Sequence, residues 1–196
     1  MNAHGAAGRH RCSSATTWRW AACVVLVAVG ATGCRLPYIP GITSPPPAAV
    51  ARLVDGNGRT VGNATFLQER KGVRILLDVS GLSPGVKAVH IHAVGRCEPP
   101  SFDSAGPHFD PTKAEHGTAN PRGPHAGDLP NLTVEPSGRG HLETTATRVT
   151  LEKGPNSLFN EDGTALVVHA NADDYRTDPA GNSGARTACG VIVRAG

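Results

Sequence analysis

Aromatic residues are scarce in this chain of 196 residues, which contains four Phe, two Trp and two Tyr. Glycine and proline are abundant by comparison, with 24 and 16 residues. Both favour turns and are costly inside regular helices. The composition therefore argues against long helices and predicts short strands joined by turns. The length suits one domain with a working hydrophobic core.

Acidic residues are absent from the first 33 positions, which hold three of the 19 basic residues, Arg9, Arg11 and Arg19. The formal charge of +3 therefore arises in this stretch, and the rest of the chain has 16 basic and 16 acidic residues. A domain with no net charge and scattered basic residues gives no support to a nucleic-acid partner. We expect no nucleic acid to bind.

A long hydrophobic run is also missing, because the apolar stretch from Ala21 to Ala31 is shorter than the roughly 20 residues of a membrane-spanning helix. It follows basic residues and ends in small ones, which is typical of an export signal. Ala31-Thr32-Gly33-Cys34 resembles the cleavage box of bacterial lipoproteins, so we expect residues 1–33 to be removed and Cys34 to be lipidated. A plain signal peptide that contains a cysteine is the alternative.

Residues 34–47 include Pro45-Pro46-Pro47 and are expected to form a semi-extended tether before a domain at 48–196. We expect an exported protein, either a lipoprotein anchored outside the cytoplasm or a periplasmic or secreted one. Membrane contact would be through the lipid alone. Of the five cysteines, only Cys97 and Cys189 then remain, and in an exported domain they most simply form one disulfide.

Eight segments have the composition of strands and are separated by turns such as Asp55-Gly56-Asn57-Gly58. They are Ala48–Val54, Val61–Gln68, Val73–Val79, Val86–Ala93, Leu132–Glu135, His141–Val149, Ala165–Ala170 and Ala188–Val193. Two long irregular loops, 95–130 and 171–184, interrupt them, and such loops in a compact domain are usually functional. The pattern predicts an all-β fold, a Greek-key sandwich or flattened barrel.

Six histidines lie in or beside these two loops. His90 and His92 are two apart in an expected strand, so their imidazoles share one face while Val89 and Ile91 share the other. Loop 95–130 adds three imidazoles and a carboxylate, a typical set for tetrahedral zinc, from His108, His116, His125 and Asp128. The alternative for the loop is a polar surface whose histidines bind nothing.

His169 ends a further expected strand. Four imidazoles suit copper, and this set would comprise His90, His92, His108 and His169. Counting His108 in both sets implies that its ring bridges the two metals, although the spacing alone does not establish a bridge. His141 lies outside every motif, and we expect it to have no metal role.

Six motifs occur in order between Ala48 and the C-terminus: His90-Ile-His92, Ser104-Ala-Gly-Pro-His108-Phe, His116-Gly, His125-Ala-Gly-Asp128-Leu, Val168-His169 and Gly184-Ala-Arg186-Thr-Ala-Cys189-Gly-Val-Ile192. Together they resemble the copper/zinc superoxide dismutase family, in its bacterial secreted type. The resemblance implies dismutation of superoxide at copper beside zinc, with the two ligand sets given above.

The resemblance also implies roles for residues that bind no metal. His108 would be the catalytic bridge, and Arg186 would dock the superoxide anion. Asp173 would be the outer carboxylate that links one copper ligand and one zinc ligand. Cys97 and Cys189 match the disulfide that pins a loop to the last strand. Bacterial members occur as monomers and as dimers, so a homodimer stays open.

Two other functions are open to a chain with these features. The first is a copper- and zinc-binding buffer outside the cytoplasm without catalysis. Such a protein would have no use for Arg186. A copper(I) carrier would favour exposed thiolates, whereas the only two cysteines expected in the mature domain are expected to form a disulfide. The second is a structural surface lipoprotein, which would leave the metal ligands without a purpose.

Overall fold

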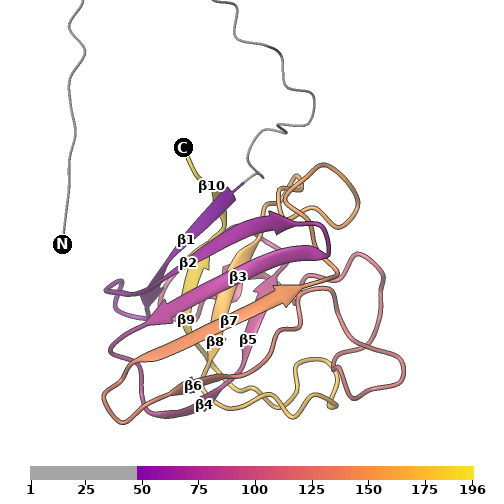
Figure 1. The fold of residues 1–196 in the computed structure, drawn as a ribbon. Coiled ribbons are helices and arrows are strands. Elements are labelled where there is room, and N and C mark those ends of the chain that lie inside the picture. The colour runs from indigo at the N-terminus through magenta and orange to yellow at the C-terminus, as the bar shows by residue number, and fades with distance from the viewer. Residues whose placement is uncertain (1–47) are drawn as a thin grey trace, which may run out of the picture. The chain divides into compact units, whose positions relative to one another are not determined.

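The computed structural model describes residues 48–196, which fold into a barrel of antiparallel strands (Figure 1). The elements are β1 (Ala48–Asp55), β2 (Thr60–Glu69), β3 (Gly72–Val79), β4 (Gly85–Lys87), β5 (Val89–His92), η1 (Asp103–Ala105), β6 (Leu132–Val134), β7 (Gly140–Ala146), β8 (Ala165–His169), β9 (Arg186–Val191) and β10 (Val193–Arg194). The expected signal, tether and lipidated Cys34 lie outside the described residues. Within residues 48–196, no helix is long and apolar enough to span a membrane.

Nine strands form one sheet in the order β4-β6-β7-β3-β2-β1-β9-β8-β5, and β10 pairs with β1. The strands at the two ends of this order, β4 and β5, follow each other directly in the chain, with only Ala88 between them. The sheet therefore curls until its ends nearly meet. The expected all-β flattened barrel is confirmed.

Alternating side chains define the inside of the barrel. In β1 the buried Ala49, Ala51 and Leu53 alternate with more exposed residues, and in β3 the side chains of Val73 and Ile75 are wholly buried. This period of two is what a strand with one solvated face requires. The buried side chains form the main core, which leaves the opposite faces and the loops free to build a site.

The expected strand Val86–Ala93 is divided into two in the structure. Its first part, β4, pairs with β6, and its second part, β5, pairs with β8. At the break, the Ala88 N–H donates to Asn171 O over 2.7 Å, and Ala88 O accepts from the His169 N–H over 2.9 Å. The chain thus leaves one partner strand for another, and no local sequence signal marks that point.

Loop 95–130 lies along β5 and has little regular structure beyond η1. Ile91 N–H donates to Gly127 O over 2.9 Å, and Phe109 N–H donates to Ile91 O over 2.8 Å. Isolated bridges pair His90 with Asp128 and His92 with His108. The long loop therefore forms an irregular edge beside the strand that carries the first two histidines.

A disulfide joins Cys97 in this loop to Cys189 in β9, with 5.6 Å between the Cα atoms. The expected pairing is confirmed. Cys189 is fully buried in a second, smaller core that also contains Phe102, Ala105, Ala165 and Val167. The covalent bond therefore anchors the start of the long loop to the barrel wall.

Reducing this disulfide is expected to lower the free energy of unfolding by roughly 4–5 kcal/mol, because chain-entropy models give that value for a loop of this size. The loop spans 92 residues. Denaturant unfolding of the oxidised and reduced metal-free protein measures the difference without a substitution in the chain. A change below about 1 kcal/mol would show that the cross-link contributes little.

Candidate metal centre

Six imidazoles and one carboxylate converge beside β5 and β8. Val89 and Ile91 point into the main core, so His90 and His92, which alternate with them, project from the opposite face. The expected division of this strand into an apolar and a ligand face is confirmed. His169 is the last residue of β8, and the remaining four residues come from loop 95–130.

Four of the imidazoles form a buried cluster in which one nitrogen from each ring lies within 4.8 Å of the others: His90, His92, His108 and His169. The Nε2 atoms of His92 and His169 are 3.3 Å apart. Their Nδ1 atoms face the carbonyl oxygens of Gly106 and Gly184 over 2.9 and 3.2 Å. A carbonyl only accepts, so Nδ1 carries the proton in each ring and the Nε2 lone pairs face one another.

The other two rings of this cluster each have a buried nitrogen without a hydrogen-bond partner among the described residues. These atoms are His90 Nδ1 and His108 Nε2. A buried polar atom without a partner costs about 1–3 kcal/mol. Four inward nitrogens, two of them unpaired and two with opposed lone pairs, fit a copper ion, which favours imidazole ligands.

The second donor set converges on one carboxylate oxygen. Asp128 Oδ1 lies 3.0 Å from the Nδ1 atoms of both His108 and His116, and 3.4 Å from His125 Nδ1. The other oxygen, Oδ2, accepts backbone N–H groups from Gly117 and His125 over 2.9 and 3.0 Å. Three imidazoles and one fixed carboxylate oxygen fit a tetrahedral zinc ion.

His108 belongs to both sets, because its Nδ1 faces Asp128 while its Nε2 faces the four-imidazole cluster. His90 also has a ring nitrogen within 4.8 Å of donor atoms of His108, His116 and Asp128. The hydrogen bonds decide in favour of His125, because its Nδ1 lies 3.3 Å from His108 Nδ1, whereas His90 directs its Nε2 toward Asp173.

Asp173 connects the two sets from outside. Its Oδ2 lies 2.9 Å from His90 Nε2, and its Oδ1 lies 2.9 Å from His116 Nε2. Each ring thereby presents Nδ1 to its own donor set. A Cβ at Gly181, whose φ is +61°, would come within 1.9 Å of Asp173 Oδ1, so only glycine leaves room for this carboxylate.

Burial and charge give the two sets different proton affinities. Burial lowers the pKa of His108 to about 4 and that of His169 to about 3, so both rings are neutral at pH 7. Burial would also lower the pKa of His116, but its hydrogen bonds to Asp128 and Asp173 outweigh this and raise the pKa to about 9. The zinc side of the metal-free centre therefore holds a proton that the copper side does not.

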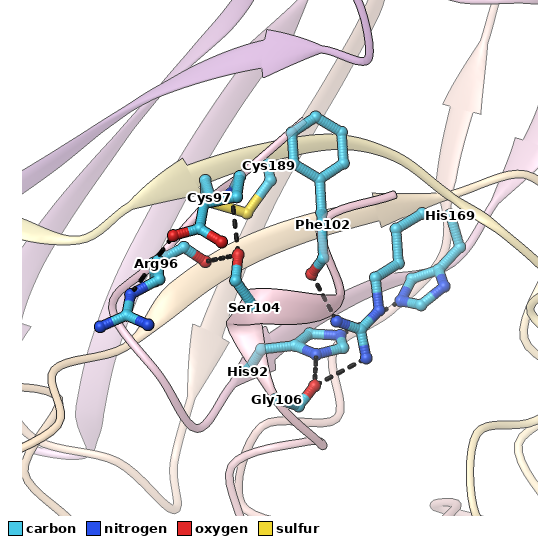
Figure 2. The surroundings of a disulfide bond; sticks show 10 residues. His92, Arg96, Cys97, Phe102, Ser104, Gly106, His169 and Cys189 are labelled. Atoms are coloured by element: carbon cyan, nitrogen blue, oxygen red, sulfur yellow. Dashed lines mark hydrogen bonds and ion pairs between the residues drawn. A yellow bond between two sulfur atoms is a disulfide. The ribbon is translucent and has the colours of Figure 1, made fainter. Parts of the chain in front are cut away.

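Arg186, the first residue of β9, lies beside the four-imidazole cluster but is not one of its ligands. Its Nη1 donates to Phe102 O over 2.6 Å, and its Nη2 donates to Gly106 O over 2.7 Å. Gly106 O also accepts from His92, as Figure 2 shows together with the nearby disulfide. The guanidinium is thus held at a fixed position next to an imidazole of the cluster.

An open cleft of about 440 Å³ leads to this position. Its wall includes Arg186 and three of the four clustered imidazoles, His92, His108 and His169. A larger hollow of about 550 Å³ lies elsewhere and contains His141, which pairs with Asp78 over 2.7 Å. It contains none of the residues of the two donor sets.

Several supporting residues were not predicted from the sequence. Phe102 is fully buried with φ +58°, a strained conformation for a bulky residue, and its carbonyl holds Arg186. Asn131 clamps the backbone of Asp173 from both sides, over 2.9 and 3.0 Å. Ser183 places Oγ 3.2 Å from His169 Nδ1. These contacts join positions that are far apart in sequence, so no local sequence pattern predicts them.

The profile of a known family, described as copper/zinc superoxide dismutase, matches residues 60–192. The chain belongs to the copper/zinc superoxide dismutase family. A superoxide dismutase [Cu-Zn] of Aquifex aeolicus is 49% identical over 144 residues, which cover 72% of this chain and 85% of that protein. Membership of this family confirms three expectations from the sequence: the fold, the use of copper and zinc, and superoxide dismutase function.

Two further relatives of this superoxide dismutase chain extend the comparison. The crystal structure of a superoxide dismutase-like protein from Bacillus subtilis superposes with a TM-score of 0.71 at 40% identity, covering 74% of this chain and 97% of that one. An extracellular superoxide dismutase [Cu-Zn] of Brugia pahangi is 35% identical over 154 residues, which cover 74% of this chain and 75% of that protein.

Zinc binding to the metal-free protein is expected to release protons at pH 7, because His116 is protonated below its raised pKa of about 9 and must free Nδ1. The contribution of His116 is complete at pH 7 and disappears as the pH rises through about 9. Calorimetric zinc titrations in two buffers of different ionisation enthalpy measure the number of protons. Zinc uptake at pH 7 without proton release would contradict this account.

Proposed function

We propose that this chain converts two superoxide anions and two protons into dioxygen and hydrogen peroxide. The observation that carries the proposal is one open cleft that contains Arg186 and the shared ring of two complete donor sets. The proposed copper ligands are His90, His92, His108 and His169. The proposed zinc ligands are His108, His116, His125 and Asp128.

Copper, when bound, supplies one-electron chemistry, and zinc adds a fixed positive charge without changing its oxidation state. The residues of the chain attract the superoxide anion, orient the ligand rings and supply protons to the reduced oxygen species. Arg186 offers a permanent charge and forked donors to a small anion, which a lysine would not reproduce. His108 lines the cleft, and its buried Nε2, which faces the four-imidazole cluster, can hold a proton and pass it to the reduced oxygen species. Asp173 keeps the rings of His90 and His116 in their productive orientation.

The metal-buffer function explains less of the site. Metal retention needs the imidazoles and Asp128, but it does not need a cation fixed in the same cleft. Among residues 48–196 no carboxylate forms an ion pair with Arg186, and burial lowers the pKa of its guanidinium although the nearby charge of Asp103 opposes this shift. Placing the cation there therefore costs solvation. An anionic substrate gives that charge a purpose.

The protein acts outside the cytoplasm, as the disulfide Cys97–Cys189 and the extracellular relative from Brugia pahangi support. We propose further that residues 1–33 are a lipoprotein signal, that Cys34 is lipidated, and that residues 34–47 are a tether for the domain 48–196. The basic and apolar order of the leader supports this proposal, as does the proline-rich stretch that follows it.

Replacing Arg186 with alanine is expected to lower the dismutation rate about 10- to 100-fold, because the anion loses charge-assisted hydrogen bonds at its docking position. Both metals should remain bound, since no donor atom is removed. Rates by pulse radiolysis and metal content by mass spectrometry test both parts.

Arg52→Ala is the matched control, because Arg52 is an exposed cation on β1 and does not line the cleft. Its rate should equal that of the parent. The parent rate should also fall as salt rises, because charges are screened over about 8 Å at physiological ionic strength. An Arg186→Ala protein with full metal content and an undiminished rate would overturn the proposed mechanism.

Mass spectrometry of the mature protein from a bacterial host is expected to find an N-terminus at Cys34 that carries lipid. One acyl chain anchors a protein only weakly, so two or three chains are expected. Cys34→Ser is the control and should yield protein without lipid. An unmodified N-terminus downstream of Cys34 in the parent would contradict lipidation and leave export alone.

A further inference from the structure

One acidic residue, Asp178, lies in the cleft that the proposed function gives to an anion. Among the described residues that line this cleft, it is the only carboxylate. A negative charge beside the path of a negative substrate opposes its approach. The contacts of the Asp178 side chain indicate a structural role that offsets this repulsion.

Asp178 connects the two long loops of the molecule. Its Oδ1 accepts the backbone N–H of His116 over 2.6 Å, across 62 positions of sequence. The same oxygen lies 4.0 Å from His125 Nε2. Asp178 thus holds the backbone of one zinc-side histidine and faces the ring of another. The hydrogen bond is short, as expected when an ionised carboxylate accepts from an amide.

The side chain of Asp178 is not enclosed, since 47% of it remains exposed. Besides the cleft it lines a second hollow of about 380 Å³ that contains Glu115, Arg122 and Arg176. The carboxylate therefore stands between the metal cleft and a group of surface charges. One of its oxygens is committed to the loop contact, while its charge is still felt by an ion in the cleft.

We propose that Asp178 is a positioning residue with two separable effects. Its acceptor oxygen fixes the zinc-side loop at His116, and its negative charge weakens the attraction of anions to the cleft. The first effect depends only on zinc being held by this donor set. The second rests on the proposed function, because it assumes that the reacting anion enters through this cleft.

Asparagine and alanine separate these effects. Asp178→Asn keeps an acceptor oxygen at the same position and removes the charge, whereas Asp178→Ala removes both. Glu152→Gln is the matched control for loss of one negative charge, since Glu152 is exposed and lies outside the cleft. All three variants and the parent are loaded with copper and zinc, and far-ultraviolet circular dichroism checks the fold.

Zinc retention is measured by transfer of zinc to a chromogenic chelator. Asp178→Ala should lose zinc about tenfold or more readily than the parent, as loss of a contact that orients a ligand typically does. Asp178→Asn should retain zinc within about twofold of the parent because its amide oxygen still accepts. If Asp178→Ala retains zinc as well as the parent, or if both variants lose zinc equally, then Asp178 does not position the zinc-side loop through its acceptor oxygen.

Anion attraction is measured with azide, an anion that binds copper(II) and changes its absorption spectrum. At low ionic strength, Asp178→Asn should bind azide about two- to fivefold more tightly than the parent, and the difference should vanish at high salt. Glu152→Gln should match the parent. An unchanged azide affinity in Asp178→Asn overturns the charge effect. Because neither readout is dismutation, failure here is distinguishable from failure of the proposed function.

Discussion

The Asp173 carboxylate holds one imidazole of each donor set, and the geometry of the whole centre depends on this pair of contacts. With His90 and His116 both 2.9 Å from its two oxygens, neither ring can turn without losing a buried charged hydrogen bond. The carboxylate is in turn fixed by Asn131 through the backbone and by the space that Gly181 leaves. A single acidic side chain therefore couples a strand of the barrel to both long loops.

A comparable arrangement fixes the cation of the site. Arg186 is the first residue of β9, and three residues later Cys189 is bonded to the loop that supplies the carbonyl of Phe102. The disulfide and the buried Phe102 thus belong to one small core, and the carbonyl of Phe102 holds the guanidinium of Arg186. The unusual backbone of Phe102 persists because its side chain is buried and its carbonyl is bonded, which is the usual condition for strain at a functional site.

Much of the fold and of the donor sets can be predicted from the sequence because their signals are local. Alternation places His90 and His92 opposite Val89 and Ile91, and the apolar segments with intervening turns give seven of the expected strands in nearly their observed positions. The break at Ala88 could not be predicted, because it depends on partners at Asn171 and His169.

The supporting residues of the site could not be predicted from local sequence patterns either, because they too depend on partners that are distant in sequence. Asn131, Ser183 and Asp178 act through contacts that span 42, 14 and 62 positions. Their residue types are common in polar loops, where most such side chains are solvated. What distinguishes them is the place to which the folded loops bring them, and this is a property of the tertiary structure.

The neutral composition of the chain beyond position 33 has a consequence for how the site attracts its substrate. With 16 basic and 16 acidic residues beyond position 33, no overall charge draws an anion from afar. Screening over about 8 Å limits the attraction to charges in and near the cleft. Within the cleft wall these are Arg186 and Asp178, of opposite sign. The net attraction therefore depends on the distance of each of these two charges from the docking position of the anion. Arg186 lies next to the imidazole cluster, at that docking position.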